Sequence, residues 1–279
     1  MIVLIQLLNV LLPLGYVLAV LNYLVIYVSR PEWSLRTVTP LARGLVAVHA
    51  VYLLLAALAF EHVPVASVWE AFTFIAFALA AVYLILEWRL RDPSTGVFLL
   101  TPVLFFQILS SAFVTRTQEV DPILQSSWFG AHVTTALLGY AAFAIAAVYG
   151  TLYLLLYREL KRKRTGLVFQ RLPNLEVLAR LNLNALIFGW GALTLAMLLG
   201  TAWAIGLQSR GELTGSFLLD PKFLSTAVVW VLYGSCLGGR YVRKWPSRDL
   251  AGVSLVTFLL MVASSIGINL FADSFHSFG

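Results

Sequence analysis

The sequence predicts an all-α integral membrane protein. Of its 279 residues, 60% are hydrophobic and 11% are charged, whereas soluble domains have about 25% charged residues. The mean hydropathy is +0.88. Apolar runs of about twenty residues, the length that crosses a bilayer as a helix, recur along the chain. We therefore expect a single transmembrane domain over residues 1–279.

Eight apolar segments are long enough to form a bundle of transmembrane helices. They are residues 3–28, 41–60, 65–88, 97–114, 128–157, 183–206, 223–240 and 249–272. The first segment is too long for the core of a cleavable signal, and no basic residue precedes it. Between the fifth and sixth segments, Pro173 and a leucine stripe predict a short interfacial helix near 172–182. That helix is interpreted either as a membrane anchor or as a docking site for a cytoplasmic partner.

The fifth segment is predicted to be the central helix. It begins with Trp128 and a lone histidine, His132, and a basic run follows its end at 161–164. At helical spacing, one face of the segment is composed mainly of small residues. The face consists of His132, Thr135, Gly139, Phe143, Ala146 and Gly150. Another helix or a flat ligand can approach such a face closely.

The distribution of positive charge predicts the orientation of the helices. With eight spans, all but three of the 19 Lys and Arg residues fall on one side, the exceptions being Arg116, Arg210 and Lys222. The positive-inside rule places the basic side in the cytoplasm and both termini outside. We expect a multi-pass protein of the cytoplasmic (inner) membrane of a prokaryote. The net charge of +6 then indicates the lipid bilayer as the partner, and not nucleic acid.

The four histidines are the main candidates for chemistry. His132 and His276 lie on the outer side, His49 lies within the second span, and His62 lies in a short outer loop. Each alone is compatible with an ordinary hydrogen-bonded side chain. As a pair, His132 and His276 have the chemistry of two axial ligands to a haem iron, with Trp128 beside them to line an apolar slot.

Other site chemistries have less support in the sequence. Zinc remains an alternative to haem if Asp273 supplies a further ligand. The chain has one cysteine, Cys236, and no CxxCH motif, which excludes an internal disulfide and covalent c-type haem. No Ser/His/Asp grouping, paired-carboxylate motif or Walker motif is present, and we therefore expect no enzymatic activity.

Five segments resemble, in order, those of a known family. They are VPVASVWEAFTFIAF (63–77), WFGAHVTTALLGYAAFAIAAVYGTLYLL from Trp128, the stretch 172–204 beginning LPNLEVLARLN, DPKFLSTAVVWVLY (220–233) and the terminal FHSFG. The chain thus resembles the cytochrome c assembly family of membrane haem proteins, which includes CcsA, CcmC and HemX-type members. The resemblance covers most of the chain.

The resemblance implies the cofactor and its ligands. His132 and His276 match the external axial ligands of a non-covalent haem b, and His49 matches a histidine assigned to a membrane-embedded haem. Asp220 and Lys222 remain from the loop that covers the external haem, where they would organise a lid or meet the propionates. The tryptophan-rich motif of that loop is not intact, and Gly238 stands where CcsA has a second intramembrane histidine. Both departures favour the HemX-like branch.

The leading functional prediction is a membrane protein that handles or transports haem for cytochrome c assembly. Its expected partners are a cytochrome c maturation protein or an apocytochrome, and a cytoplasmic protein at the basic loop 158–182. One alternative is a HemX-like regulator of haem biosynthesis. Another is a haem-bearing or structural subunit of a respiratory membrane complex.

Overall fold

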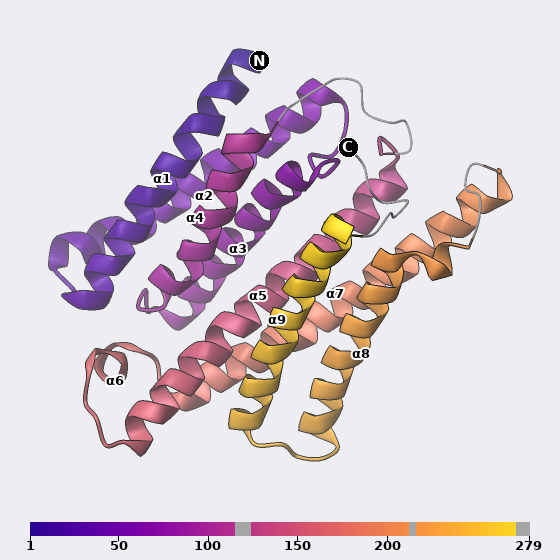
Figure 1. Ribbon diagram of the computed structural model, residues 1–279. Coiled ribbons are helices and arrows are strands. Elements are labelled where there is room, and N and C mark those ends of the chain that lie inside the picture. Colours follow the sequence, from indigo (N-terminus) through magenta and orange to yellow (C-terminus); the bar gives the residue numbers. More distant parts are fainter. Residues whose placement is uncertain (115–123, 212–215, 272–279) are drawn as a thin grey trace. The chain divides into compact units, whose positions relative to one another are not determined.

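The computed structural model describes residues 1–114, 124–211 and 216–271, and the regular structure of this part of the chain is helical (Figure 1). Its elements are α1 (Ile2–Val28), α2 (Glu32–Phe60), α3 (Val68–Leu90), α4 (Gly96–Phe113), α5 (Ser127–Lys161), α6 (Leu167–Arg171), α7 (Leu175–Ser209), the 3-10 turn η1 (Phe217–Leu219), α8 (Pro221–Tyr241) and α9 (Ser247–Phe271). The predicted all-α class is confirmed.

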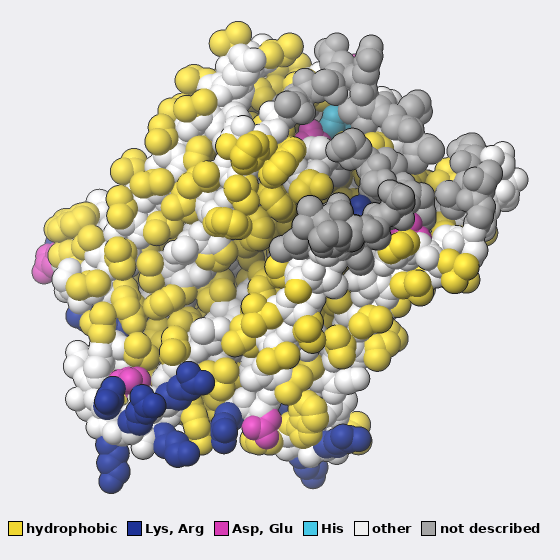
Figure 2. Space-filling view, in the orientation of Figure 1, with side chains coloured by type: hydrophobic (Ala, Val, Ile, Leu, Met, Phe, Trp, Pro, Cys, Tyr) yellow, Lys and Arg dark blue, Asp and Glu magenta, His cyan; other side chains and the backbone are white. Residues whose placement is uncertain are grey.

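Seven of the helices in the described ranges combine the length and hydropathy of a membrane span, namely α1 to α5, α7 and α9. The chain is therefore a multi-pass membrane protein. The predicted segment 223–240 forms the 21-residue helix α8, which is not among these seven. Its hydropathy is lower because Lys222 and Arg240 lie near its ends and Trp230, Tyr233 and Gly234 interrupt its aliphatic run. Hydrophobic side chains cover the flanks of the helices, and Lys and Arg gather near helix ends (Figure 2).

The helices form two compact units, which are described separately. Unit 1 comprises Met1–Ser126 and Arg164–Pro173, and unit 2 comprises Ser127–Lys163 and Asn174–Gly279. In unit 1, α1 packs on α2 and α4, and α3 packs on α2 and α4. The short helix α6 belongs to this unit, and Arg171 at its end donates to the carbonyl of Val28 at 3.1 Å. The expectation of one domain over residues 1–279 stays a prediction.

Unit 1 buries polar side chains as well as apolar ones. The Glu87 carboxylate is 5% exposed and accepts hydrogen bonds from Tyr23, Tyr83 and Thr39. Because hydroxyl donors surround the carboxylate, its burial does not leave an unsatisfied polar group.

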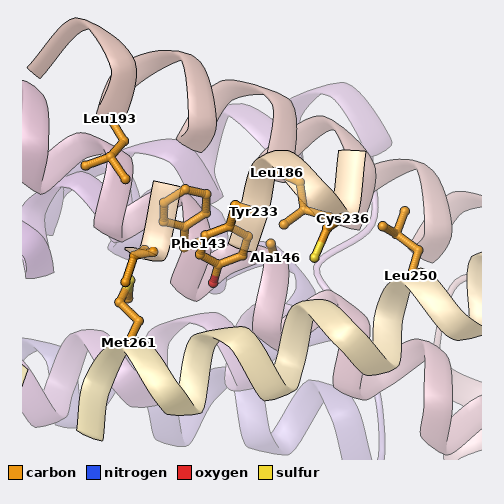
Figure 3. Packing of buried hydrophobic residues seen from close by; sticks show 9 residues of the cluster. Phe143, Ala146, Leu186, Leu193, Tyr233, Cys236, Leu250 and Met261 are labelled. Atoms are coloured by element: carbon orange, nitrogen blue, oxygen red, sulfur yellow. The ribbon is translucent and has the colours of Figure 1, made fainter. Parts of the chain in front are cut away.

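In unit 2, α5 lies along α7 and α9, and α8 packs on α9 (Figure 1). Their core contains Phe143, Ala146, Leu186, Leu193, Val229, Tyr233, Cys236, Leu250 and Met261, most of which are labelled in Figure 3. The rings of Phe143 and Tyr233 stack with centroids 3.7 Å apart. This packing joins α5 to α8 at the centre of the unit.

The small-residue face of α5 packs against α7. The prediction that another helix could approach this face closely is therefore confirmed. A Cβ on Gly139 would lie 3.3 Å from the backbone oxygen of Gly189, and a Cβ on Gly189 would lie 2.7 Å from the Phe143 ring. Asn182 of α7 is 1% exposed and donates from Nδ2 to the carbonyl of Ala146 at 2.7 Å. Close backbone approach and an interhelical hydrogen bond both stabilise helix pairs in membranes.

The predicted interfacial helix at 172–182 is wrong as a separate element. Pro173 precedes Asn174, whose side chain caps α7 by accepting from the Val177 N–H at 2.9 Å. The helix then runs without interruption for 35 residues. Leu178 in the middle of the leucine stripe is fully buried, so this part of the stripe packs against protein. The short helix in this region is α6, which ends before Pro173.

Candidate functional site

A pocket opens between α5, α7 and the start of α8 in unit 2, with a volume of about 170 Å³. We call it the His132 pocket. Its wall consists of His132, Ala136, Tyr140, Leu193, Ala196, Met197, Gly200, Thr201, Trp203, Ala204, Phe217, Lys222, Phe223 and Thr226. The wall is largely apolar, with few polar groups.

His132 lies one turn into α5 and is partly buried. Its Nδ1 lies 2.8 Å from the carbonyl oxygen of Ala196 in α7. A carbonyl only accepts hydrogen bonds, so Nδ1 carries a proton, and in the neutral ring Nε2 then presents its lone pair. A backbone carbonyl on one ring nitrogen is the usual arrangement for a histidine that binds a metal through the other nitrogen.

The imidazole ring fits against α7 because Gly200 has no side chain. A Cβ at this position would lie 2.6 Å from Cε1 and 2.7 Å from Nδ1 of His132. Ala196 and Ala204 occupy the preceding and following turns of the same face. Small residues at spacing i, i+4, i+8 therefore line the pocket on α7, and Gly200 among them forms the seat of the ring.

The rest of the pocket provides flat aromatic walls and one cation. Trp203 is 6% exposed, and its ring centroid lies 5.7 Å from that of Phe129. The rings of Phe217 and Phe223 meet edge to face at 5.9 Å. Lys222 supplies the positive charge. These groups suit a planar, mostly apolar ligand with a negatively charged edge.

Asp220 holds the chain segment that brings Lys222 and Phe223 to the pocket. Its carboxylate is the N-cap of α8 and accepts from the backbone N–H groups of Lys222 at 2.9 Å and Phe223 at 3.2 Å. The predicted site residue is thus placed near the pocket, with a capping role that fixes its neighbours.

The other predicted site residues are placed differently. Trp128 is 55% exposed and does not line the pocket, although it lies in the first turn of α5, about one turn before His132. His276 and the alternative zinc ligand Asp273 lie outside the described residues. Within the described ranges, no group of three or more His, Cys, Asp or Glu residues is placed to hold a metal ion.

His49 lies in unit 1, fully buried in a chain of hydrogen bonds. Tyr16 of α1 contacts Nδ1 at 2.9 Å, Nε2 contacts Thr73 of α3 at 2.9 Å, and Thr73 donates to Gln107 of α4 at 2.9 Å. Thr73 uses its one hydrogen on Gln107, so Nε2–H of His49 donates to Thr73 and Tyr16 donates to Nδ1. Both ring nitrogens are occupied, and coordination by His49 would require one of these bonds to open. Its role as a haem ligand stays a prediction.

Sequence reasoning did not identify the α7 side of the pocket. In the sequence, Ala196, Gly200 and Trp203 stand within an apolar run that predicts a membrane span. The available signal was the small-residue repeat Ala196, Gly200, Ala204, which permits close approach of a neighbouring group.

The fold and the site together define a multi-pass helical membrane protein with an imidazole presented to an apolar, aromatic pocket. The sequence profile of the cytochrome C assembly protein family matches residues 44–276. The chain belongs to this family. The matched range includes His132 and His49 and ends at His276.

Individual relatives agree with this assignment. Protein HemX of Brevibacillus brevis is 29% identical over 249 residues, covering 87% of this chain and 89% of the relative. Cytochrome c biogenesis protein CcsA of Chlamydomonas reinhardtii is 27% identical over 234 residues, covering 78% of this chain and 61% of the relative. CcsA of Microcystis aeruginosa is 25% identical over 266 residues, covering 77% and 79%.

Proposed function

We propose that this protein binds a non-covalent haem b in the His132 pocket and handles it for cytochrome c assembly. The observation that supports this most is the Nδ1 bond to Ala196, which leaves Nε2 of a neutral imidazole for a metal inside an aromatic pocket. Haem iron would supply two axial coordination positions there. His276, which the family match includes, is the proposed second ligand.

Six residues of the pocket wall have roles in this proposal. The Ala196 carbonyl orients His132 and fixes its tautomer. Lys222 pairs with a propionate, since a cation near a carboxylate forms a charge-assisted hydrogen bond. Tyr140, Trp203 and Phe223 exclude water from the faces of the ring. The proposed partner that receives the haem is an apocytochrome or a cytochrome c maturation protein.

The test is an absorption spectrum of purified protein. We expect a Soret band and a low-spin, six-coordinate spectrum in the oxidised state. His132→Gly should lower haem content and open one axial position, and added imidazole should partly restore the low-spin spectrum. Ala131→Gly is the matched control, because it introduces the same helix-weakening glycine at the adjacent exposed position. His276→Gly should behave like His132→Gly.

The proposal fails if wild-type protein binds no haem, or if His132→Gly and Ala131→Gly retain equal haem with identical spectra. A haem-free protein that alters the rate of haem synthesis would support the second candidate, a HemX-like regulator. That candidate is favoured by the match to Protein HemX, which extends over 89% of the relative.

The proposed topology places the His132 pocket on the outer side of a prokaryotic cytoplasmic membrane, with both termini outside. The basic residues at 158–164 support this orientation under the positive-inside rule. In a Cys236→Ser background, Gln125→Cys should react with an impermeant thiol reagent in intact cells, and Thr165→Cys should react after lysis only. The reverse pattern would overturn the orientation.

A further inference from the structure

A second pocket in unit 2 lies at the other end of the bundle from His132. It has a volume of about 370 Å³ and is lined by residues of α5, α7, α8 and α9. We call it the basic pocket. Its wall consists of Tyr153, Leu175, Glu176, Ala179, Arg180, Leu183, Arg240, Ser247 and Leu250. No role in haem binding is assigned to these residues.

The position of the basic pocket along α7 corresponds to a membrane surface. Ala179 in its wall and Gly200 in the His132 pocket lie on one unbroken helix. At 1.5 Å rise per residue they are separated by about 30 Å along the helix axis. This distance is close to the thickness of the hydrocarbon core. The two pockets therefore lie at opposite surfaces of a bilayer that α7 crosses.

Arg240 is a preorganised cation at this surface. Its Nη1 donates to the carbonyl of Trp245 at 2.8 Å, and the Trp245 N–H donates back to Gly239 at 3.0 Å. The indole lies directly on Gly239, where a Cβ would be 2.6 Å from the ring. The guanidinium is thus fixed by the α8–α9 loop, and its planar fork matches the oxygens of a phosphate.

Arg180 is the second cation, and its present partner is weak. Its Nη2 lies 3.5 Å from the carboxylate of Glu176 one turn earlier, with side chains 63% and 86% exposed. An exposed i,i+4 pair of this kind contributes little stability. Arg180 can therefore exchange Glu176 for an anion that enters the pocket at small cost.

The remaining wall combines helix N-termini with apolar side chains. Leu175 and Ser247 are the first residues of α7 and α9, so the positive ends of two helix dipoles face this region. Leu183, Leu250 and Ala179 line the same cavity beside the arginines. A ligand that satisfies both kinds of wall has an anionic phosphate joined to an apolar body.

We propose that the basic pocket binds the phosphate of an anionic phospholipid from the surrounding leaflet. Basic pockets between transmembrane helices at a membrane surface are a known means of holding such headgroups. The apolar wall favours a lipid phosphate over free inorganic phosphate, because it offers contacts that only the glycerol and acyl portions can use. The proposal is independent of haem binding.

The test is native mass spectrometry of detergent-purified full-length protein titrated with phosphatidylglycerol or phosphatidylcholine. We expect one phosphatidylglycerol to bind preferentially. Its affinity should fall at least tenfold in Arg180→Gln/Arg240→Gln. Arg243→Gln/Lys244→Gln is the matched control, because it removes two exposed charges of the α8–α9 loop outside the pocket. The control should lower the affinity less than twofold.

Further measurements distinguish specific lipid binding from diffuse surface charge and from binding of free phosphate. Arg180→Gln alone leaves the Arg240 contacts with the loop intact and should still weaken phosphatidylglycerol binding severalfold. Equal losses in the pocket and control double variants would overturn the proposal, since diffuse surface charge would then account for binding. Equal affinity for phosphatidylcholine would also overturn it. If millimolar inorganic phosphate displaces the bound lipid and stabilises the protein as much as the lipid does, the pocket binds free phosphate and the lipid proposal is wrong.

Discussion

The contact between Gly200 and His132 can be tested by adding a single methyl group. In Gly200→Ala, the new Cβ would lie 2.6 Å from Cε1 and 2.7 Å from Nδ1 of the imidazole. Ordinary contact between such atoms needs about 3.5–4.0 Å. The ring must therefore retreat by about 1 Å. This lengthens the 2.8 Å bond from Nδ1 to Ala196 beyond hydrogen-bonding range.

The expected cost follows from these two changes. Overpacking costs about 1–3 kcal/mol, and the lost hydrogen bond adds about 1 kcal/mol. The better helix propensity of alanine returns about 1 kcal/mol. We expect a net loss of about 1–3 kcal/mol in unfolding free energy. Loss of the orienting partner of a metal-binding histidine typically lowers affinity about 10–100-fold, and haem retention should fall by that amount.

Gly191→Ala is the matched control, since it lies in the same helix and its Cβ would meet nothing within 4 Å. Thermal unfolding in detergent and haem titration of both variants give the two quantities. Gly191→Ala should be neutral or slightly more stable. Equal stability of the two variants would refute the packing argument. A destabilised Gly200→Ala with wild-type haem affinity would refute the role of the Ala196 bond in haem binding.

Substitutions at Asn182 and Asp220 test two further contacts in unit 2. Asn182→Ala removes the hydrogen bonds that the side-chain amide donates to Ala146 of α5 and to Ser254 of α9. It should lower the unfolding free energy by about 1–2 kcal/mol, measured by thermal unfolding. Asn184→Ala, at an exposed position of the same helix, should have almost no effect, and equal losses in both would contradict this reasoning. Asp220→Ala should cost about 1 kcal/mol by removing the cap of α8, whereas Asp220→Asn should retain it. If Asp220→Asn lowers haem retention as much as Asp220→Ala, the carboxylate charge acts on the pocket and the cap alone is an insufficient explanation.

Much of the fold could be predicted from the sequence because a bilayer permits few alternatives. An apolar run of about twenty residues must satisfy its backbone internally, and a helix does so. The small face of α5 is visible in the sequence as a spacing of small residues, and it predicts close approach of another helix or a flat ligand. The structure identifies that helix as α7. The beginning of α7 was mispredicted because the leucine stripe after Pro173 has the same pattern whether it meets lipid headgroups or a protein core.

The site could be predicted in part. His132 was identifiable as a rare polar residue at the end of a long apolar run. The bond to Ala196 and the seat at Gly200 were not predictable, since they depend on the register of α7 against α5. A slip of one residue would turn Gly200 about 100° away from the imidazole. The sequence of either helix alone does not specify that register.

The hydrogen-bond chain of unit 1 has a single direction. Donation runs from Tyr16 to His49, then to Thr73 and Gln107, and so passes once through each of the helices α1 to α4. The acceptor at the end, the side-chain carbonyl of Gln107, sets the sense of every bond before it. Without that acceptor the Thr73 hydroxyl is free to turn toward the ring, and the proton on the imidazole can then reside on the other nitrogen. The tautomer of a histidine in α2 is thus determined by an amide in α4, two helices away.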